Sequence, residues 1–273
     1  MSAGTKRYAV VGDPVAHSLS PLIHNRWMKQ AGLDAEYSLL HLQSADAAAD
    51  IRALAQTYSG LNVTLPHKLA ALAAATKVSP DAQRVGAANT LTRENGQDWS
   101  ADNTDVAGFS DALQAAIGND LKGKRVVLIG AGGAARAAAL YLARAGAMTM
   151  IVNRSILNAQ ALARDLASNA ETADLAQLGQ CAENAVLVVN SASLGHAGAN
   201  LPALPAGKGR PFLDLSYGKA AESTLVSAAS AGWTPHDGLR MLVGQAAIAF
   251  ERWTATSAPI DVMRAAARAA LPT

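Results

Sequence analysis

The chain has 273 residues, of which half are hydrophobic and 16% are charged, and its formal net charge is +2. This length allows two domains with a substantial core. The weak charge excludes the strong basic field that nucleic-acid binding requires, so we expect no nucleic-acid partner.

The cysteines and histidines limit which kinds of site and cellular compartment the sequence allows. The single Cys181 excludes an internal disulfide, which fits a reducing cytoplasm. The six histidines stand singly rather than at ligand spacing, so we expect no metal site. The sequence starts without an apolar signal segment, and no apolar run reaches the length of about 18 residues that a membrane span needs. We therefore expect a soluble, cytoplasmic protein.

The first hundred residues alternate between expected strands and helices. Strands are predicted at 7–12, 36–41 and 60–63, and helices at 21–31 and 45–58 lie between them. Short helices follow at 69–75 and after the turn at Ser79 and Pro80. Strands at 87–93 and 97–101 then flank Glu94-Asn95-Gly96, which is typical of a β-hairpin. The order predicts a mostly parallel sheet covered by helices.

A helix over 104–117 leads to a polar stretch at 120–123, which we interpret as the connection to a second α/β unit. That unit begins with strands at 126–129 and 148–152 on either side of an Ala-rich helix. Further strands are predicted at 185–189 and 211–215. Two final helices are predicted at 239–253 and 260–270, with a break at Pro259.

The turn after the strand at 126–129 carries the clearest signal in the sequence. Gly130, Gly132 and Ala135 match the dinucleotide fingerprint G-x-G-x-x-G/A. Gly130 allows the tight turn, Gly132 lets the backbone approach a pyrophosphate, and Ala135 lets the helix pack closely. The helix that starts at about Gly133 directs its free N–H groups at the phosphate. Dinucleotide binding is the prediction, and a bare packing turn is the alternative.

The residues after the next strand indicate which dinucleotide binds. An NAD site usually has Asp or Glu about 20 residues after the glycines, where it holds the ribose 2′-hydroxyl. This chain has Asn153-Arg154-Ser155, in which a guanidinium and a hydroxyl can donate to a 2′-phosphate. The sequence therefore favours NADP. Asn153 and Ser155 are also suited to cap the helix that follows.

Three polar groups of residues stand at strand ends or loop starts in the first unit, where ligand-contacting residues of α/β sheets are placed. They are Ser18 with Ser20, the segment 62–68, and the segment 102–105. A hydride transfer to a carbonyl needs a proton donor, and a Lys oriented by an Asp suits that role. Lys68 and Asp102 are candidates. A solvated surface charge is the alternative for each, as a helix cap is for Ser20, Thr104 and Asp105.

Seven segments together resemble the shikimate dehydrogenase family, over nearly the whole chain. They are 12–21, 62–68, 86–90, 102–105, 130–135, 153–155 and 237–245. The resemblance implies NADPH-dependent reduction of 3-dehydroshikimate to shikimate. It also implies a substrate domain formed by 1–103 with 240–273, a Rossmann-type NADP domain at 104–239, and an active site in the cleft between them.

The resemblance assigns roles to residues by their position in the family's motifs. It implies Lys68 and Asp102 as the catalytic pair. The implied substrate-binding residues are Ser18, Ser20, Asn62, Thr64, Asn89, Tyr217 and Gln245. The implied cofactor-binding residues are Gly130, Ala131, Gly132, Gly133, Ala134, Asn153, Arg154, Ser155, Leu215 and Gly238. Hydroxyl and amide groups suit a polyhydroxylated ring because they can both donate and accept.

The sequence departs from the family's pattern at four positions, the first of which is Ser155, where a Thr is common. Asn158 stands where a second Arg is common, so NADP selectivity is expected to depend mainly on Arg154. Arg240 replaces a glycine close to the expected nicotinamide position, where it could crowd the cofactor, point to solvent or contact a phosphate. Val106 replaces a glycine at a helix start, with little expected effect.

Two other functions remain open. One is a broader quinate/shikimate dehydrogenase that uses NAD, which Asn158 and Arg240 would favour. The other is a non-catalytic dinucleotide-sensing relative, although the retention of Lys68 and Asp102 argues against it. The expected partner is a small-molecule substrate, and the expected assembly is a monomer or homodimer.

Overall fold

The structure is a computed structural model, which describes residues 4–94, 96–118, 120–167, 169–192 and 201–271. The chain divides into two compact units. The first unit runs up to Asp105 and resumes at Leu242–Ala270, and the second is Val106–Met241 together with Leu271. The boundaries expected from the sequence were residues 103 and 240. The chain passes between the units within two helices, α5 (Asp105–Ile117) and α10 (Leu239–Thr254).

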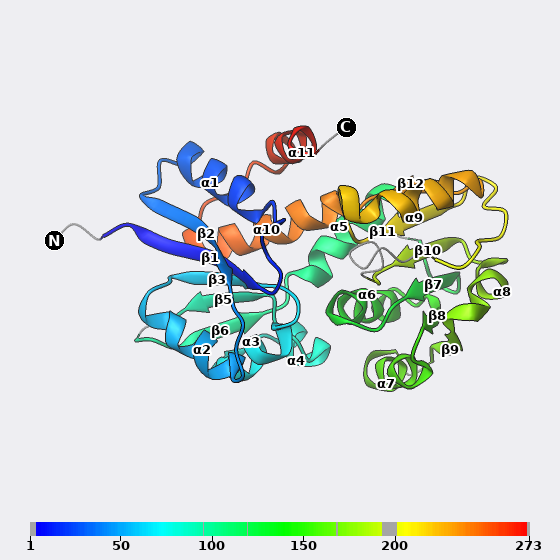
Figure 1. The fold of residues 1–273 in the computed structure, drawn as a ribbon, viewed down its shortest axis with the longest axis horizontal. Helices are drawn as coiled ribbons and strands as arrows, with labels where there is room; N and C mark the ends of the chain where they lie inside the picture. Colours follow the sequence, from blue (N-terminus) through cyan, green and yellow to red (C-terminus); the bar gives the residue numbers. More distant parts are fainter. Residues whose placement is uncertain (1–3, 95, 119, 168, 193–200, 272–273) are drawn as a thin grey trace. The chain divides into compact units, whose positions relative to one another are not determined.

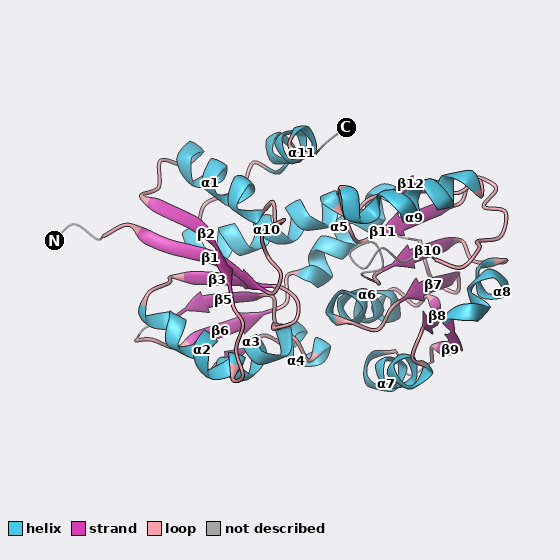
Figure 2. Cartoon of the chain, in the orientation of Figure 1, coloured by secondary structure: helices cyan, strands magenta, loops and turns pink. Residues whose placement is uncertain are grey.

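The first unit is built on a six-stranded mixed sheet (Figures 1 and 2). In spatial order its strands are β2 (Ala35–His41), β1 (Lys6–Gly12), β3 (Gly60–Val63), β5 (Thr90–Arg93), β6 (Trp99–Asp102) and β4 (Lys77–Val78). β1 pairs in parallel with β2 and β3, and β4 pairs in parallel with β6. β5 runs antiparallel to both of its neighbours. The first residue of β5 therefore lies beside the last residues of β3 and β6, at the same end of the sheet.

Helices cover both faces of this sheet. They are α1 (Ser20–Gln30), α2 (Ala47–Ala53), α3 (Lys68–Ala74), α4 (Pro80–Val85), α11 (Ile260–Ala269), the 3₁₀ turn η1 (Leu54–Gln56) and the C-terminal part of α10. Successive strand residues face opposite sides. Ala9 and Val11 accordingly pack in a cluster with residues of α2 and α3, while the Tyr8 ring stacks on Trp253 of α10 at 5.0 Å.

Several local predictions for the first unit need correction. The helix expected over 45–58 is shorter, because α2 ends at Ala53 and continues only as η1. The short strand β4 was not expected. The predicted strand pair around residues 94–96 is present and antiparallel, although Asn95 of the predicted turn lies outside the described residues.

The second unit is built on a fully parallel six-stranded sheet. In spatial order its strands are β12 (Thr234–His236), β11 (Pro211–Asp214), β10 (Leu187–Asn190), β7 (Arg125–Ile129), β8 (Met148–Asn153) and β9 (Glu171–Asp174). Its remaining helices are α6 (Gly133–Arg144), α7 (Ile156–Leu166), η2 (Leu175–Gln177), α8 (Leu178–Ala182) and α9 (Lys219–Ser230). The strand order reverses between β7 and β10, which is where a dinucleotide binds in a doubly wound sheet.

Candidate functional site

The polar residues expected in the first unit gather at one end of the strands of its sheet, where β3 and β6 end and β5 begins. The pairing register aligns Asn62 of β3 with Thr90 of β5, and Thr90 with Asp102 of β6. Lys68 opens α3 shortly after β3, and Asp105 opens α5 shortly after β6. The reversed direction of β5 thus brings the end of two strands and the start of a third into one row.

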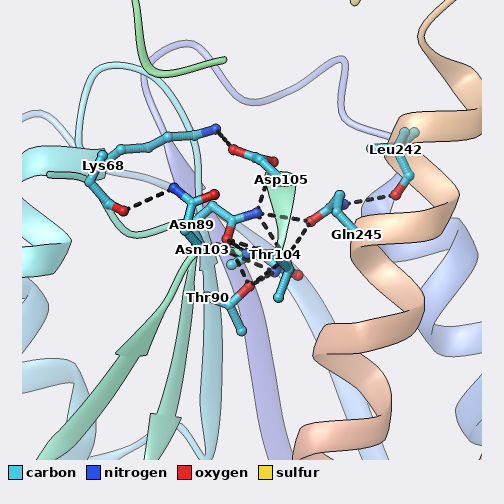
Figure 3. Close-up of polar contacts among 10 residues, drawn as sticks. Lys68, Asn89, Thr90, Asn103, Thr104, Asp105, Leu242 and Gln245 are labelled. Carbon is cyan, nitrogen blue, oxygen red and sulfur yellow. Dashed lines mark hydrogen bonds and ion pairs between the residues drawn. The ribbon is translucent and has the colours of Figure 1, made fainter. Parts of the chain in front are cut away.

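Lys68 and Asp105 form a buried ion pair at this end of the strands (Figure 3). The Lys68 Nζ donates to Asp105 Oδ2 at 2.5 Å, and the two side chains are 14% and 8% exposed. Asp105 is the first residue of α5, where the positive end of the helix dipole favours a carboxylate. The pair therefore places a cationic proton donor and an anion at one point that is largely shielded from water.

Asp102, which the sequence predicted as the partner of Lys68, has other partners. Its carboxylate accepts a hydrogen bond from the Ser79 hydroxyl and forms an ion pair with Arg252 of α10. The two aspartates of the segment 102–105 lie on different elements, since Asp102 ends β6 and Asp105 begins α5. The turn between them sends the two carboxylates to different partners, and the predicted pairing of Lys68 with Asp102 is corrected to Lys68 with Asp105.

Asn89 joins the ion pair to the rest of the site. Its Oδ1 accepts from the Thr104 backbone N–H at 2.8 Å, and its Nδ2 lies 2.9 Å from Asp105 Oδ1. The same Nδ2 is 3.2 Å from Gln245 Oε1, which belongs to α10. All four residues are buried. Figure 3 shows this network connecting Lys68 to Gln245.

Thr104 contributes to this network through its side chain. Its hydroxyl lies 3.0 Å from the Thr90 hydroxyl and 3.2 Å from Asn89 Oδ1. The sequence suggested only a helix-capping role for Thr104. Its hydroxyl instead helps to hold Asn89 beside Asp105.

Asn62 is fixed from two sides. Its Oδ1 accepts a hydrogen bond from the Tyr37 hydroxyl at 2.7 Å, and its Nδ2 donates to the Asn89 carbonyl and to Thr90 Oγ1, each at 3.3 Å. Burial raises the pKa of Tyr37 well above its ordinary value, so the phenol stays protonated. Tyr37 was not among the predicted site residues, because a single tyrosine in a strand carries no motif.

The loop before α1 holds the two predicted serines. Ser18 Oγ accepts from the Ser20 backbone N–H at 3.2 Å. Ser20 is buried and is the first residue of α1, which has no side-chain cap, so the capping alternative for Ser20 is not observed. Thr64 also lies close to this loop, since a Cβ added to Gly12 would be 2.5 Å from Thr64 Cγ2.

The glycine turn of the second unit has the features that a pyrophosphate site needs. Gly130 has a φ of +106°, and a Cβ there would be 2.6 Å from Ser191 Oγ. A Cβ on Gly132 would meet nothing within 4 Å, so this side of the turn is open. α6 begins at Gly133 without a side-chain cap. The remaining predicted members of this turn are Ala131 and Ala134. The N–H groups of the first helical turn suit an anion.

The segment after β8 leaves one side chain suited to a 2′-phosphate. Ser155 caps α7, because its Oγ accepts from the Asn158 N–H. Asn153 Nδ2 donates to the Ser155 carbonyl at 3.0 Å. Arg154 is exposed. Asn153 and Ser155 thus shape the turn, and the Arg154 guanidinium is the donor that it presents.

The remaining predicted residues of the second unit lie after β11 and before α10. Gly238 is required by close packing, since a Cβ there would be 2.1 Å from the Leu215 carbonyl oxygen. Tyr217 is partly buried two residues after Leu215. Arg240 donates to the Asp111 carbonyl through Nε at 3.0 Å and to Asp111 Oδ1 through Nη2 at 2.9 Å. The Arg240 side chain is therefore held against α5.

The described part of the chain shows neither a candidate metal site nor a candidate membrane span. Among those residues, no three His, Cys, Asp or Glu side chains gather so that they could hold a metal ion. Among the described helices, none is both long and apolar enough to cross a membrane.

Three family models match successive stretches of the chain. Residues 10–91 match the Shikimate dehydrogenase substrate binding domain, residues 112–198 match Shikimate / quinate 5-dehydrogenase, and residues 238–268 match the Shikimate 5'-dehydrogenase C-terminal domain. The first of these matches contains Lys68 and Asn89, and the second contains the glycine turn.

Individual relatives are similar over nearly the whole chain. The Shikimate dehydrogenase (NADP(+)) of Hyphomonas neptunium is 48% identical over 91% of this chain and 92% of its own length. The enzyme of the same name from Xanthomonas euvesicatoria is 42% identical, with coverage of 96% and 95%. The crystal structure of Shikimate 5-Dehydrogenase from Thermus thermophilus in complex with NADP(H) and shikimate matches with a TM-score of 0.81 at 36% identity, covering 97% of this chain and 100% of that chain. These matches confirm the expected α/β fold with a substrate unit and a nucleotide-binding unit.

Proposed function

Because the chain belongs to the shikimate dehydrogenase family, we propose that it catalyses the reversible NADPH-dependent reduction of 3-dehydroshikimate to shikimate, a step in aromatic amino acid biosynthesis. The observation that carries the proposal is the buried ion pair of Lys68 and Asp105 beside the amides of Asn89 and Gln245. A proton donor fixed beside polar side chains is what the reduction of a ketone on a hydroxylated ring requires.

Lys68 and Asp105 have different roles in the proton transfer, since Lys68 gives the proton and Asp105 orients Lys68. Bound NADPH supplies the hydride that the carbonyl carbon receives. The carbonyl oxygen takes a proton from Lys68 Nζ, so that the ketone becomes a hydroxyl. Asp105 holds the ammonium through Oδ2 while its Oδ1 accepts from Asn89. In the reverse direction, Nζ takes the hydroxyl proton back.

The substrate would be held by hydroxyls and amides rather than by an Arg. We assign the substrate carboxylate to Ser18 and Ser20, which share one loop. We assign the ring hydroxyls to Thr64, Asn89, Tyr217 and Gln245. The Asn62 amide already has protein partners on both atoms, so its main role would be to orient its neighbours. A site of this kind discriminates against analogues that lack a hydroxyl, because its own groups would be left unpaired.

The residues of the second unit fit NADP. The open turn at Gly132 and the uncapped start of α6 suit the pyrophosphate, with Ala131, Gly133 and Ala134 forming the backbone of this cradle. Arg154 would hold the 2′-phosphate from the turn shaped by Asn153 and Ser155. The close approach of Gly238 to the Leu215 carbonyl leaves that backbone free of side chains where we expect the nicotinamide.

The catalytic assignment is tested by comparing Asp105→Asn with Asp102→Asn. Asp105→Asn should lower kcat by about 100-fold or more, since it removes the anion that orients Lys68. Asp102→Asn should leave kcat within about threefold and mainly lower stability, because it leaves the Arg252 ion pair unmade. Steady-state kinetics and thermal unfolding of both variants measure this. A larger loss of kcat for Asp102→Asn than for Asp105→Asn would return the catalytic role to Asp102.

A second candidate is a broader dehydrogenase acting on quinate as well as shikimate, with NAD. The neutral Asn158 near the expected 2′-phosphate position favours it. Kinetics with shikimate and quinate, each paired with NADP and NAD, distinguish the two candidates. A higher kcat/KM for quinate with NAD would select the second. Ligand binding without turnover in any combination would select a sensing role instead.

The partners and location follow from the same proposal. We infer a cytoplasmic protein that acts on a small molecule without nucleic acid and works as a monomer or homodimer. The weak net charge and the single buried thiol of Cys181 support this. Light scattering coupled to size exclusion would determine the oligomeric state, and a mass above that of a dimer would contradict the inference.

A further inference from the structure

An aromatic cluster of the first unit lies directly against the proposed substrate site. It is formed by His24, Trp27, Tyr37, Phe250 and Trp253, all of them buried. Tyr37 is the member whose polar atom bonds to the row of residues described above, through Asn62. It therefore connects a rigid apolar core to the proposed site.

The Tyr37 ring is held from several directions. His24 stacks on it with ring centroids 4.3 Å apart and planes 7° apart, and Trp253 lies 6.2 Å away at 38°. The Tyr37 backbone N–H donates to Asn25 Oδ1, and its carbonyl accepts from Asn25 Nδ2, each at 2.8 Å. A side chain fixed in this way loses little freedom when its hydroxyl makes a hydrogen bond.

The Tyr37 hydroxyl interacts with Asn62, to which the proposed function gives the role of orienting its neighbours in the substrate site. It donates to Asn62 Oδ1 at 2.7 Å. The phenol thus joins the aromatic cluster to the row of polar residues at the proposed substrate site.

The hydroxyl also determines which way the Asn62 amide faces. With Oδ1 accepting from Tyr37, Nδ2 can reach the Asn89 carbonyl and Thr90 Oγ1. Without that donor, the buried Oδ1 loses its partner and the amide is free to turn over, which would set Nδ2 away from Asn89 and Thr90. Asn89 contacts Asp105 directly, so the orientation of Asn62 affects the substrate site as a whole.

We propose that Tyr37 is a positioning residue of the substrate site, whose hydroxyl fixes Asn62 in the orientation that supports substrate binding. The inference rests on the proposed function, since it concerns binding of the same ring. Tyr37 acts through its neighbours and need not touch the substrate itself.

Tyr37→Phe tests this with the removal of one oxygen atom and little change to the ring packing. The KM and the dissociation constant for shikimate should rise about tenfold, the value for one lost hydrogen bond within a polar network. The KM for NADP should not change, and kcat should change by less than KM. Calorimetry gives the dissociation constant, and initial rates give the kinetic constants.

Tyr8→Phe is the matched control. Tyr8 lies directly opposite Tyr37 in the pairing of β1 with β2, is equally buried, and stacks on the same Trp253. It should leave the KM for shikimate unchanged. Equal rises in KM for Tyr8→Phe and Tyr37→Phe would show a general packing effect and overturn the proposal.

A double variant tests the route through Asn62. In an Asn62→Ala background, Tyr37→Phe should add less than about twofold to KM, because the two residues act as one unit. A further tenfold rise in KM when Tyr37→Phe is added to Asn62→Ala would contradict an effect that acts through Asn62. If the wild-type chain neither binds nor turns over shikimate, the proposed function itself fails, and this inference fails with it. If the wild type is active and Tyr37→Phe matches it in both KM and affinity, only the inference about Tyr37 fails.

Discussion

His24 is a residue whose ionisation should be visible in the stability of the whole chain. It is completely buried between aromatic rings. Burial lowers the pKa of His24 from 6.5 to about 3, so the native imidazole stays neutral while the unfolded chain binds a proton below pH 6.5. The free energy of unfolding therefore rises with pH between about 3 and 6.5. The stabilising contribution of neutral His24 is complete above that window.

This dependence can be measured by denaturant unfolding at several pH values. Within the window, His24 should contribute a slope of up to about 1.4 kcal/mol per pH unit. His24→Phe keeps an aromatic ring without a titratable group and should flatten the curve by that amount. An identical pH dependence in His24→Phe would contradict the assignment, whatever the absolute stability of the variant.

Arg154 should determine the choice of cofactor. Ser155 is engaged in capping α7 and Asn158 is neutral, so we propose the guanidinium as the main donor for a 2′-phosphate. Arg154→Ala should raise the KM for NADP by roughly 10- to 100-fold, the value of charge-assisted hydrogen bonds, and leave the KM for NAD nearly unchanged. Asn158→Arg should lower the KM for NADP. Equal effects of Arg154→Ala on both cofactors would refute this role.

The sequence singled out segments that the structure brings together, but it did not give the partners of individual residues. Lys68, Asn89 and Gln245 lie in three of these segments and belong to one network of contacts. The choice between Asp102 and Asp105 was wrong for the pairing with Lys68, because it depends on where β6 stops and α5 starts. Tyr37 was missed because its contact with Asn62 joins two strands on either side of β1, between residues 25 positions apart in the sequence.

At the scale of elements, Arg210 connects the C-terminal end of α8 to the start of β11. Its Nη1 donates to the carbonyls of Ala182, Glu183 and Ala185, at or just after the end of α8. The guanidinium also lies 4.4 Å from the Trp233 ring centroid. The carbonyls at a helix end lack partners within the helix, so one side chain satisfies several groups that α8 leaves open.

Arg210→Lys should therefore destabilise the protein despite keeping the charge. An ammonium cannot reproduce the planar fork of a guanidinium or its stacking. We expect a loss of about 1–3 kcal/mol in the free energy of unfolding, measured by urea titration, without a change in the KM for shikimate. A loss below about 0.5 kcal/mol would show that water replaces these hydrogen bonds.

Long elements were predicted more accurately than short ones. α10, which has 16 residues, was predicted at 239–253 and is observed at Leu239–Thr254. The edge strands β9 and β12 were missed, as was β4. Edge strands of two to four residues are too short for an alternating hydrophobic pattern to be recognised. They form because a neighbouring strand pairs with them rather than because of their own sequence.

At the scale of the whole molecule, the first unit depends on two separated parts of the chain. The Trp253 side chain of α10 packs on Tyr8, and its Nε1 donates to the Leu91 carbonyl at 3.1 Å. A Cβ on Gly60 would lie only 2.4 Å from the Trp253 ring. No local pattern in the sequence shows these long-range contacts. The return of the C-terminal helices was implied only by the resemblance to a family.

The two units should therefore differ as isolated fragments. Residues 106–241 are continuous and contain a complete parallel sheet, so this fragment should fold cooperatively and bind NADP. Residues 1–105 lack α10 and should remain unfolded or aggregate, because the aromatic face of the sheet would be exposed. Circular dichroism, thermal unfolding and calorimetry with NADP measure both outcomes. Cooperative unfolding of 1–105 alone would contradict the expected dependence on α10.

The reversed strand β5 also makes the molecule convenient for spectroscopy. Because β5 runs away from Asn89, its hairpin with β6 lies at the other end of the strands from Lys68 and Asp105. Gln97 in that hairpin is exposed, whereas the single native thiol of Cys181 is buried. A cysteine introduced at Gln97 would offer one accessible point for a maleimide dye. The fluorophore would then report on the folding of the first unit while the proposed catalytic residues stay chemically untouched.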